Sequence, residues 1–360
     1  MVGLRAVVEH VDARHPAAAV RVWLLVLAAL VFAMVVVGGA TRLTDSGLSI
    51  TEWKPVVGIL PPLSEADWQD AFAKYRETPE YRAVNRGMSL EAFKFIFWWE
   101  WGHRFLGRLI GIVFLVPFTW FLWQRQIPRG QASRLVAVFA LGGLQGAIGW
   151  YMVKSGLVAR VDVSQYRLAL HLGVAVLIFG LLLWMALDLR KKREGTRIAA
   201  GVNQCTAAAI LVVLVFVQIV LGAFVAGLKA GLSHNTWPLM DGSLIPPGLG
   251  AMSPWYLNLF ENVLTVQFNH RVAAYALGVV ALLHVVFVLR STAATAVRIS
   301  AAVLGLAIML QIGLGIWTLL AAVPLALGLA HQAGAIMVFA ASVWHLHRML
   351  YANDINAEVA

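Results

Sequence analysis

The chain has 360 residues, of which 60% are hydrophobic and only 13% are charged, and its mean hydropathy is +0.77. So large an apolar share excludes a soluble globular domain. The net charge of +10 does not indicate a nucleic-acid-binding protein, because the basic residues gather at the ends of long apolar segments. The composition therefore predicts an integral membrane protein that is surrounded by a lipid bilayer and has no nucleic-acid partner.

Eight apolar segments are long enough for a helix that crosses the bilayer, which needs about 20 residues. They cover residues 20–40, 100–123, 134–153, 165–187, 204–226, 265–289, 299–320 and 327–347. Basic residues mark alternate ends of these segments: Arg5, Arg14, Arg21, Arg125, Arg129, Arg134, the run 190–197, Arg290, Arg298 and Arg348. By the positive-inside rule, those ends and both termini lie in the cytoplasm. The long connections 41–97 and 227–262 then lie outside.

The first 20 residues lack a clear cleavable signal and the composition of an organelle transit peptide, so we expect a bacterial inner membrane. The lone Cys205 excludes an intramolecular disulfide and a cysteine metal cluster, and we interpret it as a packing residue. In the first outer connection, Ser64 and Asp67 form a capping-box pattern. A short amphipathic helix is expected there, within residues 64–84, as a cover over the first bundle with no part in catalysis.

The two halves of the chain repeat each other. "GLSITEWKPVVGILPP" (47–62) matches "GLSHNTWPLMDGSLIPP" (231–247), and "LQGAIGW" (144–150) matches "LQIGLGIW" (310–317). An even number of spans separates equivalent points, so the two copies have the same membrane orientation. The sequence thus predicts an all-α integral membrane protein whose eight transmembrane helices form two pseudo-symmetric four-helix bundles. The expected parts are a cytoplasmic tail (1–19), an N-terminal bundle (20–187) with a long outer loop (41–97), a cytoplasmic linker (188–203), a C-terminal bundle (204–348) and a cytoplasmic tail (349–360).

Four histidines occupy duplicated positions: His103 and His171 in the first half, and His270 and His331 in the second. Each lies in the first turns of a helix that enters from the outside, so all four are expected at similar depth. Ionisable residues within a bilayer are costly and usually functional. Facing histidines in an apolar bundle are the usual ligands of a haem iron, and the small residues of 141–149 and 310–315 would make room for a flat ring.

Two other functions remain open. His284 lies 14 residues after His270, and His345 lies 14 residues after His331, which is about four turns or roughly 21 Å along a helix. That spacing resembles dihaem transmembrane cytochromes b, which carry electrons across the bilayer. A transporter built from parallel repeats is the second alternative, although it would need broken helices and a polar site at the membrane midplane.

The first half argues against the dihaem cytochrome, because Pro117 and Met185 stand at the corresponding positions. In the second half, His345 and His347 adjoin Arg348 at the cytoplasmic edge, where a solvated histidine costs little. A single haem site at the outer end of each bundle is therefore the favoured interpretation.

The segments "GGATRLTDSGLSITEWKPVVGILPP" (38–62) and "EAFKFIFWWEWGHRFLGRLIG" (91–111), together with the duplicated histidines, resemble the haem A synthase family over essentially the whole chain. The resemblance implies an oxidoreductase that makes haem A for terminal oxidases, oxidising a methyl group of haem O to a formyl group by successive hydroxylations and loss of water. It also implies a handover from a haem O synthase and leaves a homo-oligomer open. Because the outer loops carry no cysteine pair, the chain is similar to the cysteine-poor subgroup of mitochondria and alphaproteobacteria.

The same resemblance implies which residues form the sites. His270 and His331 would hold the iron of a haem b cofactor in the C-terminal half. His103 and His171 would bind the iron of the substrate haem in the N-terminal half. The family's glutamate, three residues before the first histidine, corresponds to Glu100.

Glu100 and His103 are three residues apart and share a helix face, whereas the second half has Gln267 at the equivalent place. Because only one half keeps the carboxylate, we assign the oxidation to the first half and electron storage to the second. Glu100 would accept a proton or stabilise positive charge at the methyl carbon; the alternative is a simple ion pair with Arg104. Arg104 and Arg271 are expected to bind haem propionates, unless they extend to the membrane interface.

Overall fold

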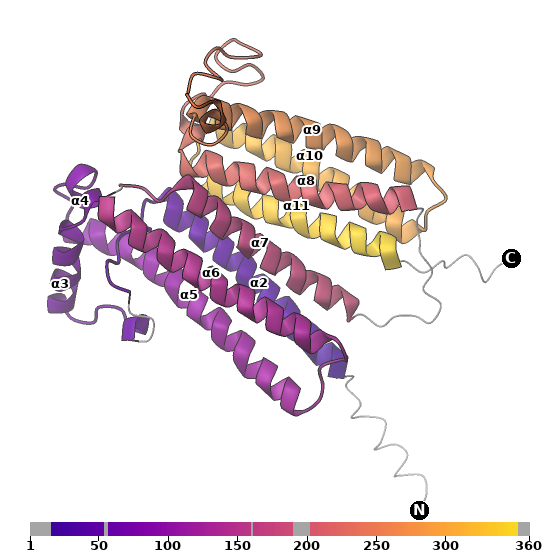
Figure 1. The fold of residues 1–360 in the computed structure, drawn as a ribbon, viewed down its shortest axis with the longest axis horizontal. Coiled ribbons are helices and arrows are strands. Elements are labelled where there is room, and N and C mark those ends of the chain that lie inside the picture. Colours follow the sequence, from indigo (N-terminus) through magenta and orange to yellow (C-terminus); the bar gives the residue numbers. More distant parts are fainter. Residues whose placement is uncertain (1–15, 54–56, 160, 190–201, 352–360) are drawn as a thin grey trace, which may run out of the picture.

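The computed structural model describes residues 16–53, 57–159, 161–189 and 202–351, and this part of the chain is almost entirely helical (Figure 1). Eight of its helices are long and apolar enough to cross a membrane. They are α2 (Pro16–Leu43), α5 (Leu90–Trp123), α6 (Gln131–Ala159), α7 (Gln165–Asp188), α8 (Val202–Gly227), α9 (Val263–Arg290), α10 (Thr295–Leu320) and α11 (Leu325–Tyr351). Each predicted segment lies within one of them, so the predicted all-α membrane fold with eight spans is confirmed.

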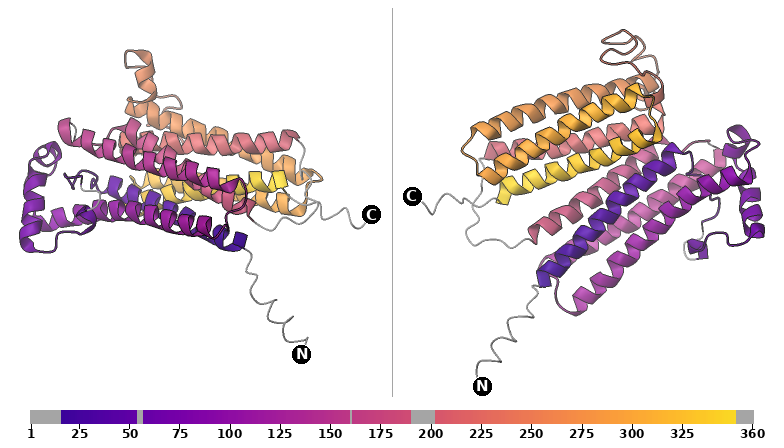
Figure 2. Two further views of the ribbon diagram at one scale, coloured as in Figure 1. Left: turned by 60° about the horizontal axis from the view of Figure 1, so that its bottom comes forward. Right: turned by 180° about the vertical axis from the view of Figure 1, so that it is seen from behind.

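The long helices lie in two groups of four (Figures 1 and 2). Helices α2, α5, α6 and α7 form one group and α8 to α11 form the other, and the groups meet where α7 packs on α8 and α2 packs on α11. The largest apolar core lies at this junction, where Leu27 of α2, Leu182 of α7, Leu211 of α8 and Ile336 of α11 are almost fully buried. These two contacts join equivalent pairs of helices, which supports the duplication that the sequence predicts.

The two groups differ in how closely they pack on one side. Helix α9 packs along α10 in the second group, but their counterparts α5 and α6 touch over only a short stretch. In the most apolar window of each helix, 6% of the residues are buried in α5 and in α6, against 22% in α9 and in α10. The first group is therefore less closed along α5 and α6 than the second group is along α9 and α10.

A helical cap covers the outer end of α5, which begins well before the predicted start at residue 100 (Figure 1). The cap consists of α3 (Glu65–Arg76) and α4 (Pro79–Ala83). The predicted capping box is confirmed, because Ser64 Oγ accepts from the Asp67 amide at 3.2 Å and Asp67 Oδ2 accepts from the Ser64 amide at 2.9 Å. A buried aromatic cluster seats the cap on α5: Trp68, Phe72, Tyr75, Phe93 and Phe97. The expected amphipathic cover is therefore present.

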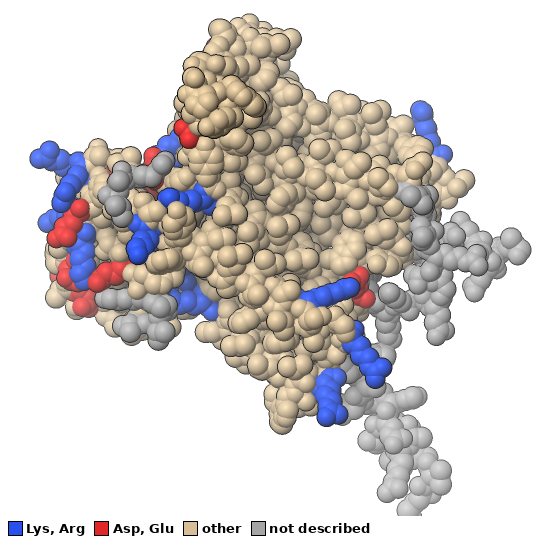
Figure 3. Space-filling view, in the orientation of Figure 1, with Lys and Arg blue, Asp and Glu red and all other residues tan. Residues whose placement is uncertain are grey.

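Charged side chains gather at the two ends of the long helices. Figure 3 shows them at the cap and at the opposite end of the molecule, with an almost uncharged surface between. A band of this kind fits the apolar interior of a bilayer, where charged side chains are costly. The described arginines Arg21, Arg125, Arg290 and Arg348 lie at helix ends far from the cap. Arg5, Arg14 and the basic run 190–197 fall outside the described residues.

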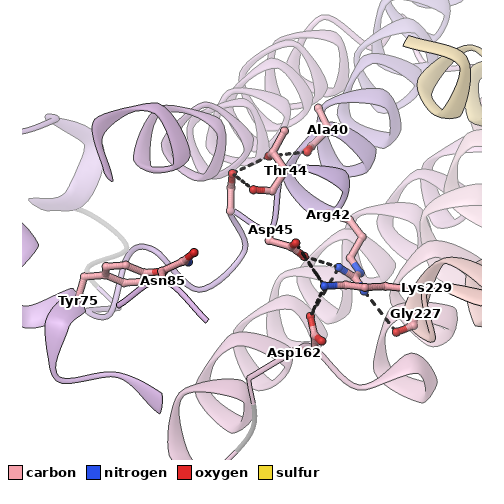
Figure 4. A network of polar contacts seen from close by, with 10 residues as sticks. Ala40, Arg42, Thr44, Asp45, Tyr75, Asn85, Asp162, Gly227 and Lys229 are labelled. Carbon is pink, nitrogen blue, oxygen red and sulfur yellow. Dashed lines mark hydrogen bonds and ion pairs between the residues drawn. The ribbon is translucent and has the colours of Figure 1, made fainter. Parts of the chain in front are cut away.

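An ionic cluster joins the outer ends of the two groups (Figure 4). Arg42 of α2 binds Asp45 at 2.9 Å and Asp162 at 3.7 Å. Lys229, which follows α8, binds the same two carboxylates at 3.1 and 3.5 Å. Arg42 Nη2 also donates to the carbonyl of Gly227 at 3.3 Å. Cations from both halves therefore neutralise two carboxylates of the first half where α2, α8 and the connection between α6 and α7 meet.

Candidate functional site

The four duplicated histidines come together in two pairs, each histidine nearer the N-terminal end of its helix. His103 of α5 and His171 of α7 are close enough to interact electrostatically, and so are His270 of α9 and His331 of α11. In the described part of the chain, no group of three or more His, Cys, Asp or Glu side chains is arranged to hold a metal ion. Paired imidazoles are therefore the candidates for metal ligation here.

Each imidazole lies against a glycine of a neighbouring helix, where no side chain holds it off. A Cβ added to these glycines would come within 2.7 to 3.3 Å of an imidazole atom. The pairs are Gly38 of α2 with His103, Gly149 of α6 with His171, Gly222 of α8 with His270, and Gly315 of α10 with His331. Two of these glycines, Gly149 and Gly315, belong to the small-residue segments 141–149 and 310–315, where the sequence predicts room for a flat ring. Part of that room is taken by the imidazoles of His171 and His331.

A glutamine amide from a neighbouring helix contacts three of the four histidines. Gln145 Nε2 donates to the carbonyl of His171 at 2.9 Å, Gln218 Nε2 to that of His270 at 3.0 Å, and Gln311 Nε2 to that of His331 at 2.7 Å. Sequence reasoning missed these residues. The repeated Leu-Gln pair at residues 144–145 and 310–311 is the signal that could have found two of them. Paired imidazoles, glycine seats and bracing amides together fit a haem iron in each half.

Glu100 is 2% exposed and lies one turn before His103 on α5. Its Oε2 accepts hydrogen bonds from Ser49 Oγ at 2.8 Å and from the Ile50 amide at 2.7 Å. Its Oε1 accepts from Arg104 Nη2 at 2.6 Å and Nε at 3.1 Å. The two oxygens thus accept four hydrogen bonds, two of them from the guanidinium of Arg104, as suits an ionised carboxylate. The ion pair with Arg104 is present, and Glu100 also fixes the loop that follows α2.

Arg104 and Arg271 both hold the loop that follows the Gly-Leu-Ser sequence of their own half. Arg104 donates to the carbonyls of Ile50 and Glu52 at 2.9 and 3.0 Å, and Arg271 donates to those of His234 and Thr236 at 2.6 and 2.8 Å. These carbonyls occupy equivalent positions in the repeat. Neither side chain extends freely to the interface, because both guanidinium groups bind the outer loops.

The two arginines differ in the donors that remain. All three donor nitrogens of Arg104 are used, whereas Arg271 Nε is buried without a hydrogen-bond partner among the described residues. At the position of Glu100, the second half has Gln267, whose amide donates to the carbonyls of Ala230 and His234 at 3.0 and 3.2 Å. The second half therefore holds the same loop without a carboxylate.

A cavity of about 280 Å³ lies on the first half, at the outer end of α5 and α6. Its lining includes two cations, one carboxylate and two indole rings: Arg104, Lys154, Glu52, Trp53 and Trp150. The Glu52 carboxylate is paired with Lys74 at 3.0 Å. Lys154 Nζ lies 4.9 Å from the centre of the Trp150 ring. The residue equivalent to Lys154 in the second repeat is Leu320. Basic groups beside flat aromatic surfaces suit a flat apolar ligand that carries acidic groups.

The second pair of histidines in the C-terminal half, His284 and His345, is in direct contact. His284 Nε2 lies 2.9 Å from His345 Nε2, and Ser300 Oγ lies 2.8 Å from His345 Nδ1. Two nitrogens that bind one metal from opposite sides would stand roughly 4 Å apart, by analogy with zinc–imidazole bonds of about 2.0–2.1 Å. This direct contact argues against a second haem and therefore against the dihaem cytochrome. His345 is 0% exposed, so its interpretation as a solvated residue is wrong; its partners lie on distant parts of the chain.

His347 lies near the C-terminal end of α11 and contacts α7. Its Nε2 is 3.2 Å from Asp188 Oδ1, and its ring centre is 5.2 Å from that of Trp184. These contacts give His347 a structural position between the two groups of helices, away from the paired imidazoles at the outer ends.

Comparison with known proteins shows the family to which this chain belongs. The family model described as cytochrome oxidase assembly protein matches residues 21–343. A haem A synthase of Parvibaculum lavamentivorans is 56% identical over 342 residues, covering 95% of this chain and 97% of the relative. Those of Bradyrhizobium diazoefficiens and Nitrosospira multiformis are 54% and 51% identical, covering 93% and 92% of this chain and 92% and 93% of the relatives. The chain therefore belongs to the cytochrome oxidase assembly protein family, the family of the haem A synthases.

Proposed function

We propose that this enzyme of haem A biosynthesis oxidises the methyl group of haem O to a formyl group, by successive hydroxylations, in its N-terminal half. The observation that carries this assignment is the difference between two otherwise similar sites. Both halves have an imidazole pair and an arginine-held loop. Only the first half adds a buried carboxylate, Glu100, and the cation Lys154 at its cavity.

His103 and His171 would bind the iron of haem O. Neither histidine lines the cavity, but Arg104 and Trp150 do, and these follow His103 and the His171 seat Gly149 in the sequence. Helices α5 and α6, which flank the cavity, pack little on each other, so a substrate that carries a long apolar tail could enter from the lipid. Lys154 and the indoles of Trp53 and Trp150 would meet the acidic edge of the substrate. Arg104 contributes its charge to the same cavity while its hydrogen bonds remain with Glu100 and the loop.

His270 and His331 would hold a haem b cofactor, and Arg271 Nε could donate to one of its propionates. When bound, haem b would accept and pass on single electrons. The tight packing of α9 on α10 and the two bracing amides suit a group that stays in place.

Glu100 would act through its negative charge. Because its two oxygens already accept four hydrogen bonds, it is better placed to stabilise positive charge that develops on the substrate than to take up a proton. The same bonds hold the loop that lines the cavity, so Glu100 would fix the shape of the site as well as its charge.

We further propose a bacterial inner membrane, with both termini in the cytoplasm and the haem sites toward the outside. The parts would be a four-helix bundle at 20–187 and another at 204–348. Haem O would arrive from a haem O synthase in the same membrane.

The function is tested by producing the chain in cells that make haem O but not haem A, and then separating the extracted haems by chromatography. New haem A is the expected result. Two haems b without conversion would support an electron-carrying cytochrome instead, and no haem would support a transporter.

A further inference from the structure

The glutamine amides contact the imidazole rings of the two second-half histidines, but not those of the two first-half histidines. In the second half both ligands have one: Gln218 Nε2 lies 3.0 Å from Nδ1 of His270, and Gln311 Nε2 lies 3.0 Å from Nδ1 of His331. In the first half, Gln145 reaches only the carbonyl of His171. Gln218 and Gln311 also donate to the carbonyls of their histidine residues, so in this structure each contacts both the ring and the turn that bears it.

The position of these amides matters because of the proton on the ring. A histidine that ligates iron through Nε2 carries a proton on Nδ1, and it needs an acceptor there to fix its orientation and raise its basicity. In this structure the Gln218 and Gln311 nitrogens face both Nδ1 and the carbonyl of the same histidine. An amide that turns by 180° would present its oxygen to an Nδ1 proton and give up its bond to that carbonyl. Gln145 Oε1, Gln218 Oε1 and His171 Nδ1 are buried with no hydrogen-bond partner in the described part of the chain. In the turned position, Gln218 Oε1 would accept from the Nδ1 proton of a ligated His270.

His103 is the exception. Gln218 lies four residues before Gly222, the glycine that seats His270, and the residue four before Gly38 is Met34. Met34 Cε lies 3.4 Å from where a Cβ of Gly107 would stand, one turn beyond His103 on α5. A thioether has no proton to donate and is a weak acceptor. The first-half ligand equivalent to His270 therefore lacks the amide that braces its counterpart.

We infer that these side chains set how firmly each half holds its haem: Gln218 and Gln311 brace both ligands of a permanent cofactor, whereas Met34 leaves His103 as the exchangeable ligand of the substrate site. This inference rests on the proposed function, because it explains how one half releases its haem after oxidation while the other retains it. Gln218 and Gln311 are positioning residues, since they act through the imidazoles.

The first test measures the reduction potential and haem retention of the purified full chain with Gln218→Leu or Gln218→Glu. Losing the acceptor weakens the imidazole as a donor, so Gln218→Leu should raise the potential of the second-half haem and lower its affinity by about 10- to 100-fold. A carboxylate accepts more strongly, so Gln218→Glu should lower the potential while retaining the haem. Gln332→Leu is the matched control, because the Gln332 amide donates to the Val35 carbonyl at 2.8 Å.

Opposite shifts from the two Gln218 variants, with no shift in the control, are expected. A purely structural glutamine would give equal or absent shifts, and that result would overturn the inference. A separate assay of haem A formation by the parent chain keeps the two questions apart. If the parent makes haem A while the potentials stay unchanged, only the role of the amides fails; if the parent makes none, the proposed function fails.

The second test installs the missing amide. Met34→Gln should slow the dissociation of haem O from the first half by about tenfold or more. Tenfold is the lower limit of the effect on affinity when a residue that hydrogen-bonds to a metal ligand is changed. Transfer of haem O from the purified protein to an excess of apomyoglobin measures this rate without turnover. Met34→Leu, which adds no acceptor, should dissociate at the parent rate. Equal rates for Met34→Gln and Met34→Leu would contradict the inference.

Discussion

Asp45 and Lys229 occupy the same position in the two halves, two residues before Gly-Leu-Ser, and their side chains bind each other at 3.1 Å. Both residues have a left-handed backbone, with φ of 49° and 52°. The same turn thus ends α2 and α8. Equivalent residues with opposite charges join the outer ends of the two halves, as Figure 4 shows.

The turn conformation at Lys229 should matter more to stability than its ion pairs. Lys229 and Asp45 are 42% and 41% exposed in their side chains, and exposed pairs contribute about 0.2–1 kcal/mol. A left-handed backbone costs a residue with a Cβ roughly 1–2 kcal/mol. Lys229→Gly should therefore be more stable than Lys229→Ala by about 1 kcal/mol in thermal unfolding in detergent. Equal stability of the two variants would show that the turn carries no strain.

Haem binding should depend on Gly315, which lies against His331, but not on Gly313, two residues before it. A Cβ on Gly315 would stand 2.7 Å from Cε1 of His331, whereas a Cβ on Gly313 of the same helix meets nothing within 4 Å. Gly315→Ala should therefore displace the imidazole and lower haem affinity by about 10- to 100-fold. Gly313→Ala should keep the haem. The absorption spectrum of the two purified variants provides the measurement, and equal haem content would contradict the seat.

Lys154 should affect substrate binding in the first half only. Lys154→Leu gives the first half the residue that the second half carries at Leu320. Because a partly exposed charge pair contributes about 0.2–1 kcal/mol, KM for haem O should rise a few-fold with little change in kcat. Lys154→Arg keeps the charge and should behave like the parent. A loss of the second-half haem in Lys154→Leu would show that the residue acts on the fold instead.

Glu80 gives the cap a pH dependence. Burial raises its pKa to about 8, repulsion by Glu100, Asp45 and Asp162 adds to this rise, and a hydrogen bond with Tyr75 opposes it. The ordinary value is 4.5, so between about pH 4.5 and 8 the folded state binds a proton that the unfolded state has lost. The stability of the cap therefore falls as the pH rises through this window and levels off above it.

Glu80→Gln should remove this slope, because the amide cannot ionise. Hydrogen exchange of α3 and α4 at pH 6 and pH 9 measures the effect. In the parent, protection should be greater at pH 6; in Glu80→Gln it should be nearly equal at the two values. The same loss of protection in both proteins would show that another group titrates.

The features set by local sequence could be predicted, and those set by contacts between distant segments could not. Hydropathy located all eight spans, and the Ser64–Asp67 pattern located the cap. The burial of His345 was missed, because its partners His284 and Ser300 come from other helices. The contacts of Arg104 with the loop carbonyls were also missed, since they depend on the folded path of that loop.

Contacts between distant segments also explain why the glutamines beside the histidines were missed, although the repeat contains them. The glutamines beside the histidines carry no charge, so nothing in composition marks them as part of a site. They become visible only when neighbouring helices are placed side by side. The looser packing of α5 on α6 could not be predicted either. Hydropathy alone does not separate the two pairs, because α5, α6, α9 and α10 are all apolar enough to cross a bilayer.

We assign the oxidation to the site beside Glu100 and not to the second half. The most direct measurement is the rate of haem A formation by purified Glu100→Gln, recorded together with its haem b spectrum. We expect an unchanged spectrum and haem A formation reduced by about 100-fold or more, the size of effect seen when one charge-stabilising group is removed. Haem A formation at the parent rate, with the substitution verified, would contradict this assignment.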